Sequence, residues 1–221
     1  MARDRAFRFT ACMAALVFAN GEPPSPAFLA SIRTGQRFVV AADGGARHAL
    51  DAGFAIDAVV GDLDSVDDGV LAALPPHAFH QVARADTTDL EKAIRFCIEA
   101  GHEEIDVVCA GGGRADHALA NLSVLTSFRT SHIRILDERF TISRVHGLAS
   151  VEAPPATVIS LVAIGLCTGV TTTGMRWDLT DFDLPFGPRG IHNEIASSPA
   201  TVRVASGDLL LFRGHWVERH R

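Results

Sequence analysis

The chain has 221 residues, enough for one large domain or two small ones with a substantial buried core. Its composition is 48% hydrophobic and 21% charged, which is typical of a soluble globular protein. The formal net charge of −6 argues against a general nucleic-acid-binding protein, because the phosphate backbone requires a basic face. A protein of this charge that handled phosphates would need a metal ion and a few well-placed cations.

The cysteines are scattered along the chain and form no Cys-x-x-Cys pair. They are Cys12, Cys97, Cys109 and Cys167. Most of them lie in apolar runs, which is typical of small core residues rather than of a disulfide framework. This usage predicts a protein of the reducing cytoplasm.

The N-terminal segment has two interpretations. Arg3, Arg5 and Arg8, followed by an apolar run at 9–19, imitate the basic start and short apolar core of a signal peptide. The alternative is a buried strand at 14–19. We favour the strand, because the run leads into a proline-rich loop and a second strand–turn–helix pattern. The run is also shorter than the about 20 apolar residues that span a bilayer, so no membrane association is expected.

From residue 14 to about residue 137, short apolar runs alternate with helical patterns. This alternation predicts an α/β domain with a mostly parallel sheet flanked by helices. Strands are expected at 14–19, 38–42, 58–60, 80–82, 105–109 and 133–136. Helices are expected at 26–33, 46–52, 69–74, 88–100 and 116–126. The helix from Thr88 is the clearest, because apolar residues recur in it at three- and four-residue spacing and Gly101 ends it.

After about residue 140 the helical patterns end, and Thr, Val and Ile alternate with polar residues between recurring turns. This predicts a C-terminal all-β, sandwich-like domain at 139–221, with a half-barrel as the alternative, after the α/β domain at 1–138. The segments 201–204 and 209–212 flank a Ser-Gly-Asp turn, and we expect them to form a hairpin. So small a β domain would be marginally stable alone, and we expect it to pack on the first domain or on a second subunit.

The stretch at 59–65, Val-Val-Gly-Asp-Leu-Asp-Ser, ends a predicted strand with two acidic residues. Asp62 and Asp64 should project to the same side, because strand side chains alternate with period two. Two carboxylates this close repel each other unless a cation lies between them. Mg²⁺ that carries a polyphosphate fits this requirement, since it binds one or two carboxylates together with phosphate oxygens and water. The alternative is a solvated acidic loop.

Two further polar clusters, at 43–45 and 111–116, also follow the carboxyl ends of predicted strands. The ligand crevice of such a sheet lies beyond these ends, so the three clusters should converge on one rim. In the first, Asp43 is followed by two glycines and a helix. Asp43 is a candidate for binding metal-bound water or a ribose hydroxyl, or alternatively for capping the helix.

The segment at 84–92, Arg-Ala-Asp-Thr-Thr-Asp-Leu-Glu-Lys, begins the clearest helix. Thr88 or Asp89 can cap it, and Lys92 lies one turn inside. One interpretation is a capped helix with an Asp89–Lys92 pair. The other is a phosphate contact by Lys92, which is the only lysine in the chain. Its ammonium group would lie one turn inside a helix that begins beside the acidic metal ligands, a position suited to a phosphate.

The segment at 111–117, Gly-Gly-Gly-Arg-Ala-Asp-His, combines a flexible loop with the start of a helix. Three glycines allow backbone N–H groups to approach an anion. The pattern is neither a P-loop nor a dinucleotide fingerprint. With Arg114, Asp116 and Asn121 it is interpreted as a nucleotide cradle, and the alternative is a tight strand–helix turn that Asp116 caps.

Four segments, at 42–46, 61–65, 86–92 and 112–121, resemble in order and spacing the motifs of the thiamine pyrophosphokinase family. They read Ala-Asp-Gly-Gly-Ala, Gly-Asp-Leu-Asp-Ser, Asp-Thr-Thr-Asp-Leu-Glu-Lys and Gly-Gly-Arg-Ala-Asp-His-Ala-Leu-Ala-Asn. In the β domain, Gly-Met-Arg-Trp-Asp-Leu at 174–179 and Gly-Ile-His-Asn-Glu at 190–194 are similar to two more segments of that family. The resemblance covers most of the chain from residue 40.

The resemblance implies a kinase that transfers the diphosphoryl group of ATP to the hydroxyl of thiamine and releases AMP. It also implies Mg²⁺, a catalytic α/β domain, a β domain, and a cytoplasmic homodimer with thiamine near the junction of subunits and domains.

By matching position, Mg²⁺ would be held by Asp62, Asp64 and Asp86. The candidate catalytic residues are Asp62, Asp64, Asp86, Asp89, Lys92, Arg114 and Asp116. The candidates for binding ATP are Asp43, Gly44, Gly45, Arg47, Ser65, Thr88, Gly112, Gly113, His117 and Asn121. Trp177, His192 and Asn193 would lie near thiamine.

One position departs from the family pattern. His192 stands where the family usually has Ser. An imidazole is bulkier than a hydroxyl and can donate or accept a hydrogen bond at the acceptor ring. Two alternatives therefore remain: a related pyrophosphokinase acting on another hydroxymethyl heterocycle such as a pterin, and a non-catalytic protein that binds a nucleotide or thiamine.

Overall fold

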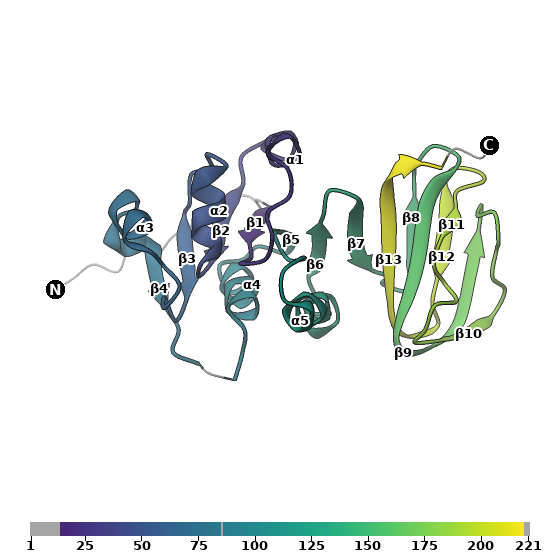
Figure 1. Ribbon diagram of the computed structural model, residues 1–221. Helices are drawn as coiled ribbons and strands as arrows, with labels where there is room; N and C mark the ends of the chain where they lie inside the picture. Colours follow the sequence, from purple (N-terminus) through teal and green to yellow (C-terminus); the bar gives the residue numbers. More distant parts are fainter. Residues whose placement is uncertain (1–13, 85, 219–221) are drawn as a thin grey trace. The chain divides into compact units, whose positions relative to one another are not determined.

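The computed structural model describes residues 14–84 and 86–218 (Figure 1). The chain divides into two compact units. The first runs to Asn121 and includes Thr130–His132, and the second contains Leu122–Arg129 and continues from Ile133. The division between the units passes through the helix α5 (Ala115–Ser127). The domain boundary expected after residue 138 from the sequence stays a prediction.

Within the described residues, five strands of the first unit form a parallel sheet in the order β4-β3-β2-β1-β5 (Figure 1). They are β1 (Ala15–Phe18), β2 (Phe38–Ala42), β3 (Ala58–Gly61), β4 (Phe79–Gln81) and β5 (Glu104–Val108). Val17 of β1 is in register with Val40 of β2 and with Val107 of β5, so β1 is a central strand. Continuous apolar runs such as Ala-Leu-Val-Phe in β1 suit strands that are covered on both faces. The predicted parallel sheet is confirmed.

The helices of the first unit lie between these strands in the chain. They are α1 (Pro26–Ser31), α2 (Gly45–Asp51), α3 (Asp68–Ala73), a 3₁₀ turn η1 (Pro76–Ala78), α4 (Asp89–Glu99) and the start of α5. Side-chain caps fix three of their first turns: Ser25 for α1, Asp67 for α3 and Thr88 for α4. The apolar face of α4 is buried and contacts β1, β2 and β3, as its sequence spacing predicts.

The described part of the N-terminal apolar run forms the buried strand β1, within the strand expected at 14–19. All four residues of β1 are buried between β2 and β5. The basic residues Arg3, Arg5 and Arg8 lie outside the described residues. Among the described residues, none of the helices has the length and apolar character needed to cross a membrane.

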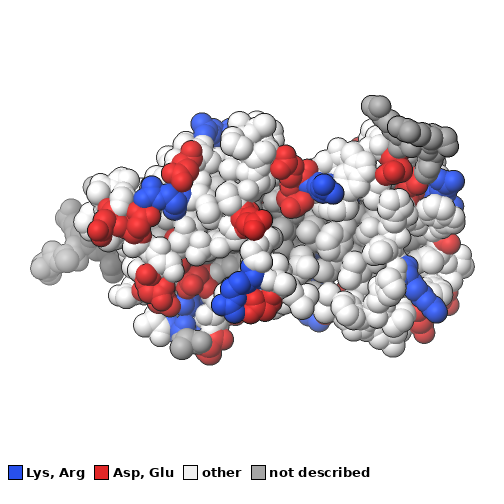
Figure 2. All heavy atoms as spheres, in the orientation of Figure 1, with Lys and Arg blue, Asp and Glu red and all other residues white. Residues whose placement is uncertain are grey.

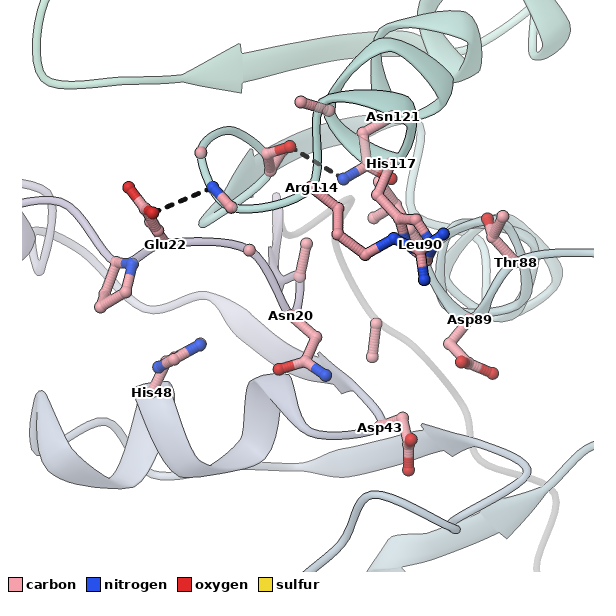
Figure 3. A pocket seen from close by; sticks show the side chains of 18 of the residues that line it. Asn20, Glu22, Asp43, His48, Thr88, Asp89, Leu90, Arg114, His117 and Asn121 are labelled. Carbon is pink, nitrogen blue, oxygen red and sulfur yellow. Dashed lines mark hydrogen bonds between the residues drawn. The ribbon is translucent and has the colours of Figure 1, made fainter.

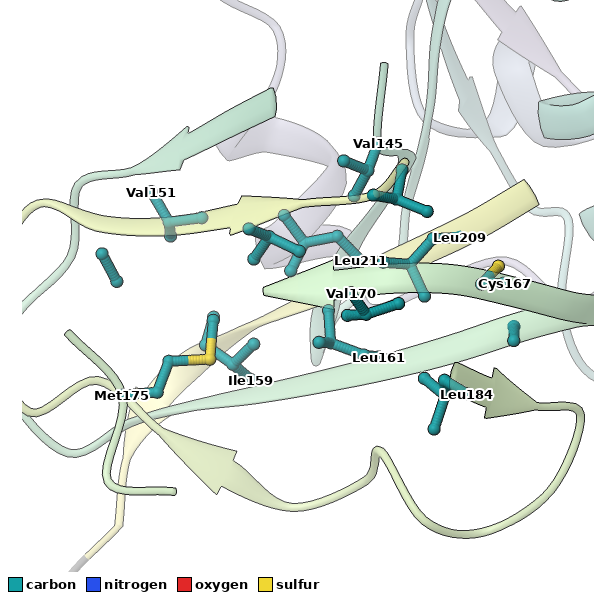
Figure 4. Close-up of a cluster of buried hydrophobic side chains, with 14 of the residues drawn as sticks. Val145, Val151, Ile159, Leu161, Cys167, Val170, Met175, Leu184, Leu209 and Leu211 are labelled. Carbon is teal, nitrogen blue, oxygen red and sulfur yellow. The ribbon is translucent and has the colours of Figure 1, made fainter. Parts of the chain in front are cut away.

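The second unit is built from antiparallel strands. They are β6 (His132–Leu136, whose first residue belongs to the first unit), β7 (Phe140–Arg144), β8 (Leu148–Val151), β9 (Thr157–Thr173), β10 (Phe182–Pro185), β11 (Asn193–Glu194), β12 (Ala200–Arg203) and β13 (Ser206–Val217). The long strand β9 pairs with β13 between Thr157 and Thr168, and it also pairs with β10, β11 and β12. Apolar side chains from these strands, including Ile159, Leu161 and Leu209, form one buried cluster (Figure 4). The predicted all-β, sandwich-like architecture is confirmed.

The predicted hairpin between 201–204 and 209–212 is wrong. β12 pairs with β8 and with the end of β9 at Thr171–Thr173, whereas β13 pairs with β7 and with β9 between Thr157 and Thr168. The 17-residue strand β9 offers a separate partner segment to each of them. The Ser-Gly-Asp segment therefore begins β13 instead of forming the turn of a hairpin.

The described cysteines behave as core residues. Cys97, Cys109 and Cys167 are buried thiols without a disulfide. Burial raises the pKa of Cys97 and of Cys109 to about 12, so neither thiol forms a thiolate near neutral pH. Cys109 is not part of β5, as the sequence had suggested, because its φ of 57° is left-handed and ends the strand.

Candidate functional site

A cleft of about 670 Å³ lies at the carboxyl edge of the parallel sheet, where β1, β2, β3 and β5 all end. Side chains reach it from the segments that follow these strands and from the starts of α4 and α5 (Figure 3). The polar residues that line it are Asn20, Glu22, Asp43, His48, Ser65, Thr88, Asp89, Arg114, His117 and Asn121. The predicted convergence of the three polar clusters on one rim is confirmed.

Three carboxylates from two neighbouring strand tips gather beside this cleft. Asp43 follows β2, and Asp62 and Asp64 follow β3. One carboxylate oxygen from each lies within 4.8 Å of those of the others. Ser65 connects the two tips, because its N–H donates to Asp43 Oδ2 (3.2 Å) and its hydroxyl donates to Asp64 Oδ1 (2.9 Å).

Asp43 is the buried member of this group, with only 2% of its surface exposed. Its Oδ1 atom has no hydrogen-bond partner among the described residues. Its pKa is raised from the ordinary value, first by burial and then by the charges of Asp89 and Asp64, although the hydrogen bonds from Ser65 act in the opposite direction. A divalent cation between the carboxylates would satisfy the Oδ1 atom and offset this repulsion.

The pair formed by Asp89 and Lys92 lies next to the same group. Lys92 Nζ donates to Asp89 Oδ1 at 2.8 Å, and the Lys92 side chain is only 4% exposed. A Cβ placed on Gly61 would lie 2.8 Å from Asp43 Cβ and 3.1 Å from Asp89 Oδ1, so both acids approach the end of β3 closely. The structure therefore shows the predicted ion pair between Lys92 and Asp89. A phosphate contact by Lys92 stays a prediction.

The structure groups Asp43, rather than Asp86, with Asp62 and Asp64. Asp86 accepts two hydrogen bonds from Arg84, at 3.0 and 2.7 Å, and both side chains are exposed. These bonds hold the pKa of Asp86 below its usual value. A local, two-residue ion pair thus occupies the carboxylate that the resemblance assigned to the metal. The assignment of Asp86 is untested, and the metal site proposed below uses Asp43 in its place.

The triple-glycine loop after β5 places Arg114 and His117 at the cleft (Figure 3). Arg114 donates two hydrogen bonds to Asp116, at 3.1 and 2.6 Å, which lower the pKa of Asp116 to about 2. Asn121 fastens the loop to its helix by donating to the Ala110 carbonyl oxygen at 2.8 Å. Gly112 and Gly113 have φ values of 72° and 60°, a conformation that favours glycine.

The Asp-Gly-Gly segment after β2 owes its glycines to close packing. A Cβ on Gly45 would lie 2.2 Å from the carbonyl oxygen of Phe18, and one on Gly44 would lie 2.5 Å from the Asn20 side chain. Arg47, a candidate for binding ATP, instead donates two hydrogen bonds to Asp67, the cap of α3. The structure thus places Arg47 in a contact between helices and not among the residues that line the cleft.

In the second unit, the three candidates for binding thiamine lie on two adjacent segments. Trp177 N–H donates to Asn193 Oδ1 at 3.2 Å, and Asn193 Nδ2 donates to the Trp177 carbonyl oxygen at 2.8 Å. The Arg176 guanidinium lies 4.8 Å from the centroid of the exposed Trp177 ring. The exposed His192 has a left-handed φ of 60°, and its N–H donates to Ser160 Oγ at 3.0 Å.

Two family models match the chain. The thiamin pyrophosphokinase catalytic domain matches residues 29–136, and the thiamin pyrophosphokinase vitamin B1 binding domain matches residues 146–209. The chain belongs to the thiamine pyrophosphokinase family. The resemblance found in the motifs is thereby confirmed, and a pterin as the acceptor is not favoured, because both descriptions name thiamin.

Curated members of the thiamine pyrophosphokinase family align with most of the chain. Thiamine pyrophosphokinase 1 of Oryza sativa subsp. japonica is 29% identical over 208 residues, which are 80% of this chain and 78% of the relative. Thiamine pyrophosphokinase of Bacillus subtilis is 29% identical over 184 residues, which are 79% of this chain and 86% of the relative.

Crystal structures of the thiamine pyrophosphokinase family share the fold. That of thiamine pyrophosphokinase from Bacillus subtilis has a TM-score of 0.80 at 24% identity and covers 91% of this chain and 98% of that chain. That of thiamin pyrophosphokinase from Geobacillus thermodenitrificans has a TM-score of 0.80 at 25% identity and covers 92% of this chain and 98% of that chain.

Sequence reasoning missed several residues that line the cleft of this thiamine pyrophosphokinase family member. Asn20 and Glu22 follow β1, and His48 lies in α2. The sequence pattern after the first strand predicts only a proline-rich loop. Its position at the carboxyl end of a parallel strand was a usable signal, because ligands bind beyond these ends.

Proposed function

We propose that the chain transfers the diphosphoryl group of ATP to the hydroxyl group of thiamine, with Mg²⁺ as its metal ion. The observation that carries this proposal is the group of Asp43, Asp62 and Asp64, whose carboxylate oxygens lie within 4.8 Å of one another at the edge of the sheet. The adjoining cleft of about 670 Å³ is large enough for a nucleotide. Membership of the family supports ATP and thiamine as the substrates.

The residues at this edge fit a magnesium ion. All donor atoms of the group are carboxylate oxygens, the ligands that hard divalent cations prefer. The buried Asp43 Oδ1 atom has no hydrogen-bond partner among the described residues, so a bound cation would satisfy it. An exposed acidic loop would have no such buried acceptor. Asp43, Asp62 and Asp64 would hold the ion. When bound, Mg²⁺ would offset the negative charge of the phosphates.

In the proposed reaction, the hydroxyl oxygen of thiamine attacks the β-phosphorus of ATP. A bond forms between this oxygen and the β-phosphorus. The bond from the β-phosphorus to the oxygen it shares with the α-phosphate breaks, and AMP leaves. Asp89, whose Oδ1 atom is held by Lys92, orients the acceptor hydroxyl and takes its proton. Arg114 offsets charge on the phosphates, so catalysis rests mainly on positioning and electrostatics.

For the acceptor, we propose that Trp177, His192 and Asn193 bind thiamine. All three lie within the match to the vitamin B1 binding domain, and hydrogen bonds hold Trp177 and Asn193 together.

A cytoplasmic homodimer is also proposed. Support for a dimer comes from large exposed apolar side chains of the second unit, which include Leu166, Phe186 and Ile191.

Product analysis tests the proposal. With ATP, thiamine and Mg²⁺, we expect AMP and thiamine diphosphate in equal amounts. Asp62→Ala should lower the rate by about a hundredfold or more, because it removes charge stabilisation in the transition state. Glu99→Ala, at the exposed end of α4, is a control that should leave the rate unchanged. Formation of ADP, or nucleotide binding without any AMP, would contradict the proposal, and the latter result would favour a non-catalytic binding protein.

A further inference from the structure

The triple-glycine loop of the cleft is tied to the segment after β1 by both the backbone and the side chain of Glu22. Glu22 N–H donates to the Gly111 carbonyl oxygen at 2.8 Å. Gly113 N–H donates to Glu22 Oε1 at 3.0 Å (Figure 3). A Cβ on Gly112 would lie 2.5 Å from Glu22 Oε2, so the carboxylate lies directly against the loop. The loop therefore already contacts a negative charge of the chain itself.

This carboxylate decides which ligand group the loop accepts. Loops of this kind bind anions through backbone N–H groups, but the Gly113 N–H already has an anionic acceptor. A phosphate placed here would face the Glu22 charge and be repelled by it. Glu22 Oε2 accepts no hydrogen bond from the part of the chain that the structure describes, and Glu22 lines the cleft. It is thus suited to a neutral hydroxyl donor.

The two sides of the cleft differ in chemistry. Glu22 and His48 lie on one side, and Asp43 and Asp89 lie on the other (Figure 3). Arg114 extends from the glycine loop toward the Asp89 side, away from Glu22 (Figure 3). Arg114 and the carboxylates that would hold a metal ion lie on the same side, so the phosphates are expected there. The nucleoside part of the ligand must then extend toward Glu22.

We propose that Glu22 binds the ribose hydroxyls of the nucleotide and makes the cleft selective for nucleotides that carry them. This assignment rests on the proposed function, which places the phosphates at the acidic side. A carboxylate near a strand tip is a suitable acceptor for sugar hydroxyls, because it offers two oxygens and full charge. One oxygen of Glu22 holds the loop, and the other binds the sugar.

Nucleotide binding in the absence of thiamine tests this assignment, because no acceptor is then present. Calorimetric titration with Mg²⁺ would compare ATP and 2′,3′-dideoxy-ATP. We expect the wild-type chain to bind ATP about tenfold more tightly, since a hydrogen bond to a charged acceptor contributes an effect of this size. Glu22→Ala should bind the two nucleotides equally, with its affinity for 2′,3′-dideoxy-ATP within about twofold of wild type.

Two variants serve as controls, and thermal unfolding checks that each is folded. Glu22→Gln retains an oxygen for the Gly113 N–H and for the sugar, so it should keep part of the preference. Glu104→Ala removes an exposed carboxylate at the opposite end of β5 and should keep all of it.

Several outcomes would overturn the assignment: a wild-type chain without preference, or a Glu22→Ala variant that binds both nucleotides more weakly by the same factor. The second result would mean that Glu22 only fastens the loop. A chain that shows the preference but forms no AMP with thiamine would overturn the proposed reaction and support the role of Glu22. A chain that binds neither nucleotide would overturn both.

Discussion

Asp43 combines three features that oppose stability at one position. It is 2% exposed, its Oδ1 atom lacks a partner among the described residues, and its φ of 47° is left-handed. Leu63, between Asp62 and Asp64, is also left-handed, with a φ of 68°. Strained backbone and unsatisfied polar atoms concentrate at functional sites, where a ligand offsets their cost. The strain at these two strand tips therefore supports a metal site.

Asp43→Asn should stabilise the metal-free protein and impair its activity. The amide removes a charge that is buried beside Asp64 and Asp89, and Asn tolerates a left-handed φ. We expect the free energy of unfolding, measured by denaturant titration in EDTA, to rise by about 1 kcal/mol. AMP formation should fall by about tenfold or more. A less stable variant with full activity would contradict this interpretation of Asp43.

We expect Lys92 to stabilise the fold chiefly by neutralising the negative charge of Asp89. Lys92→Met should lower the free energy of unfolding by about 1–2 kcal/mol, less than for a fully buried pair, because the Asp89 side chain is 34% exposed. Adding Asp89→Asn should restore most of this loss but not the activity. The measurement is a double-mutant cycle by denaturant titration. If the second substitution restored no stability, the pair would not be the cause.

At the scale of elements, the contact between α2 and β1 depends on a missing side chain. Gly45→Ala would place a Cβ 2.2 Å from the Phe18 carbonyl oxygen, which is backbone of the central strand. We expect a loss of about 2–3 kcal/mol of unfolding free energy from this overlap. Gly111→Ala is the matched control, because no atom lies within 4 Å of its added Cβ, and it should change stability by no more than about 0.5 kcal/mol. Equal losses in both variants would contradict the steric explanation.

The elements that could be predicted from the sequence are those that local patterns specify. The buried runs of β1 and β2, the apolar face of α4 and the convergence of the strand tips all follow from periodicity and from the geometry of parallel sheets. The wrong hairpin of β12 and β13 depended on the long strand β9. β12 pairs with β9 at Thr171–Thr173 and β13 continues from Thr168 toward Thr157, so the two strands follow one another along β9 instead of pairing together. Local sequence does not encode such a partner.

The site was predictable only in part for the same reason. The motifs identified Asp62 and Asp64, because both follow one strand. The choice between Asp43 and Asp86 as their neighbour depends on the order of strands and on the Arg84 ion pair, which no spacing rule reveals. Glu22 escaped notice because its partner, Gly113, lies 91 residues away along the chain.

At the scale of the whole molecule, the family and the exposed apolar side chains of the second unit predict a homodimer. Sedimentation equilibrium should give about twice the 23.5 kDa mass of the chain, with little dependence on salt, because apolar contacts are not screened. A monomer at micromolar concentration would contradict the proposed dimer without affecting the metal site.

The central claim is that Asp43, Asp62 and Asp64 share one divalent ion with the nucleotide. Binding of Mn²⁺, followed by electron paramagnetic resonance in the presence of a non-hydrolysable ATP analogue, tests it most directly. We predict that Asp43→Asn and Asp62→Asn each weaken Mn²⁺ binding by about tenfold or more, whereas Asp86→Asn changes it by no more than about twofold. Strong loss of Mn²⁺ binding in Asp86→Asn, together with unchanged binding in Asp43→Asn, would contradict the account.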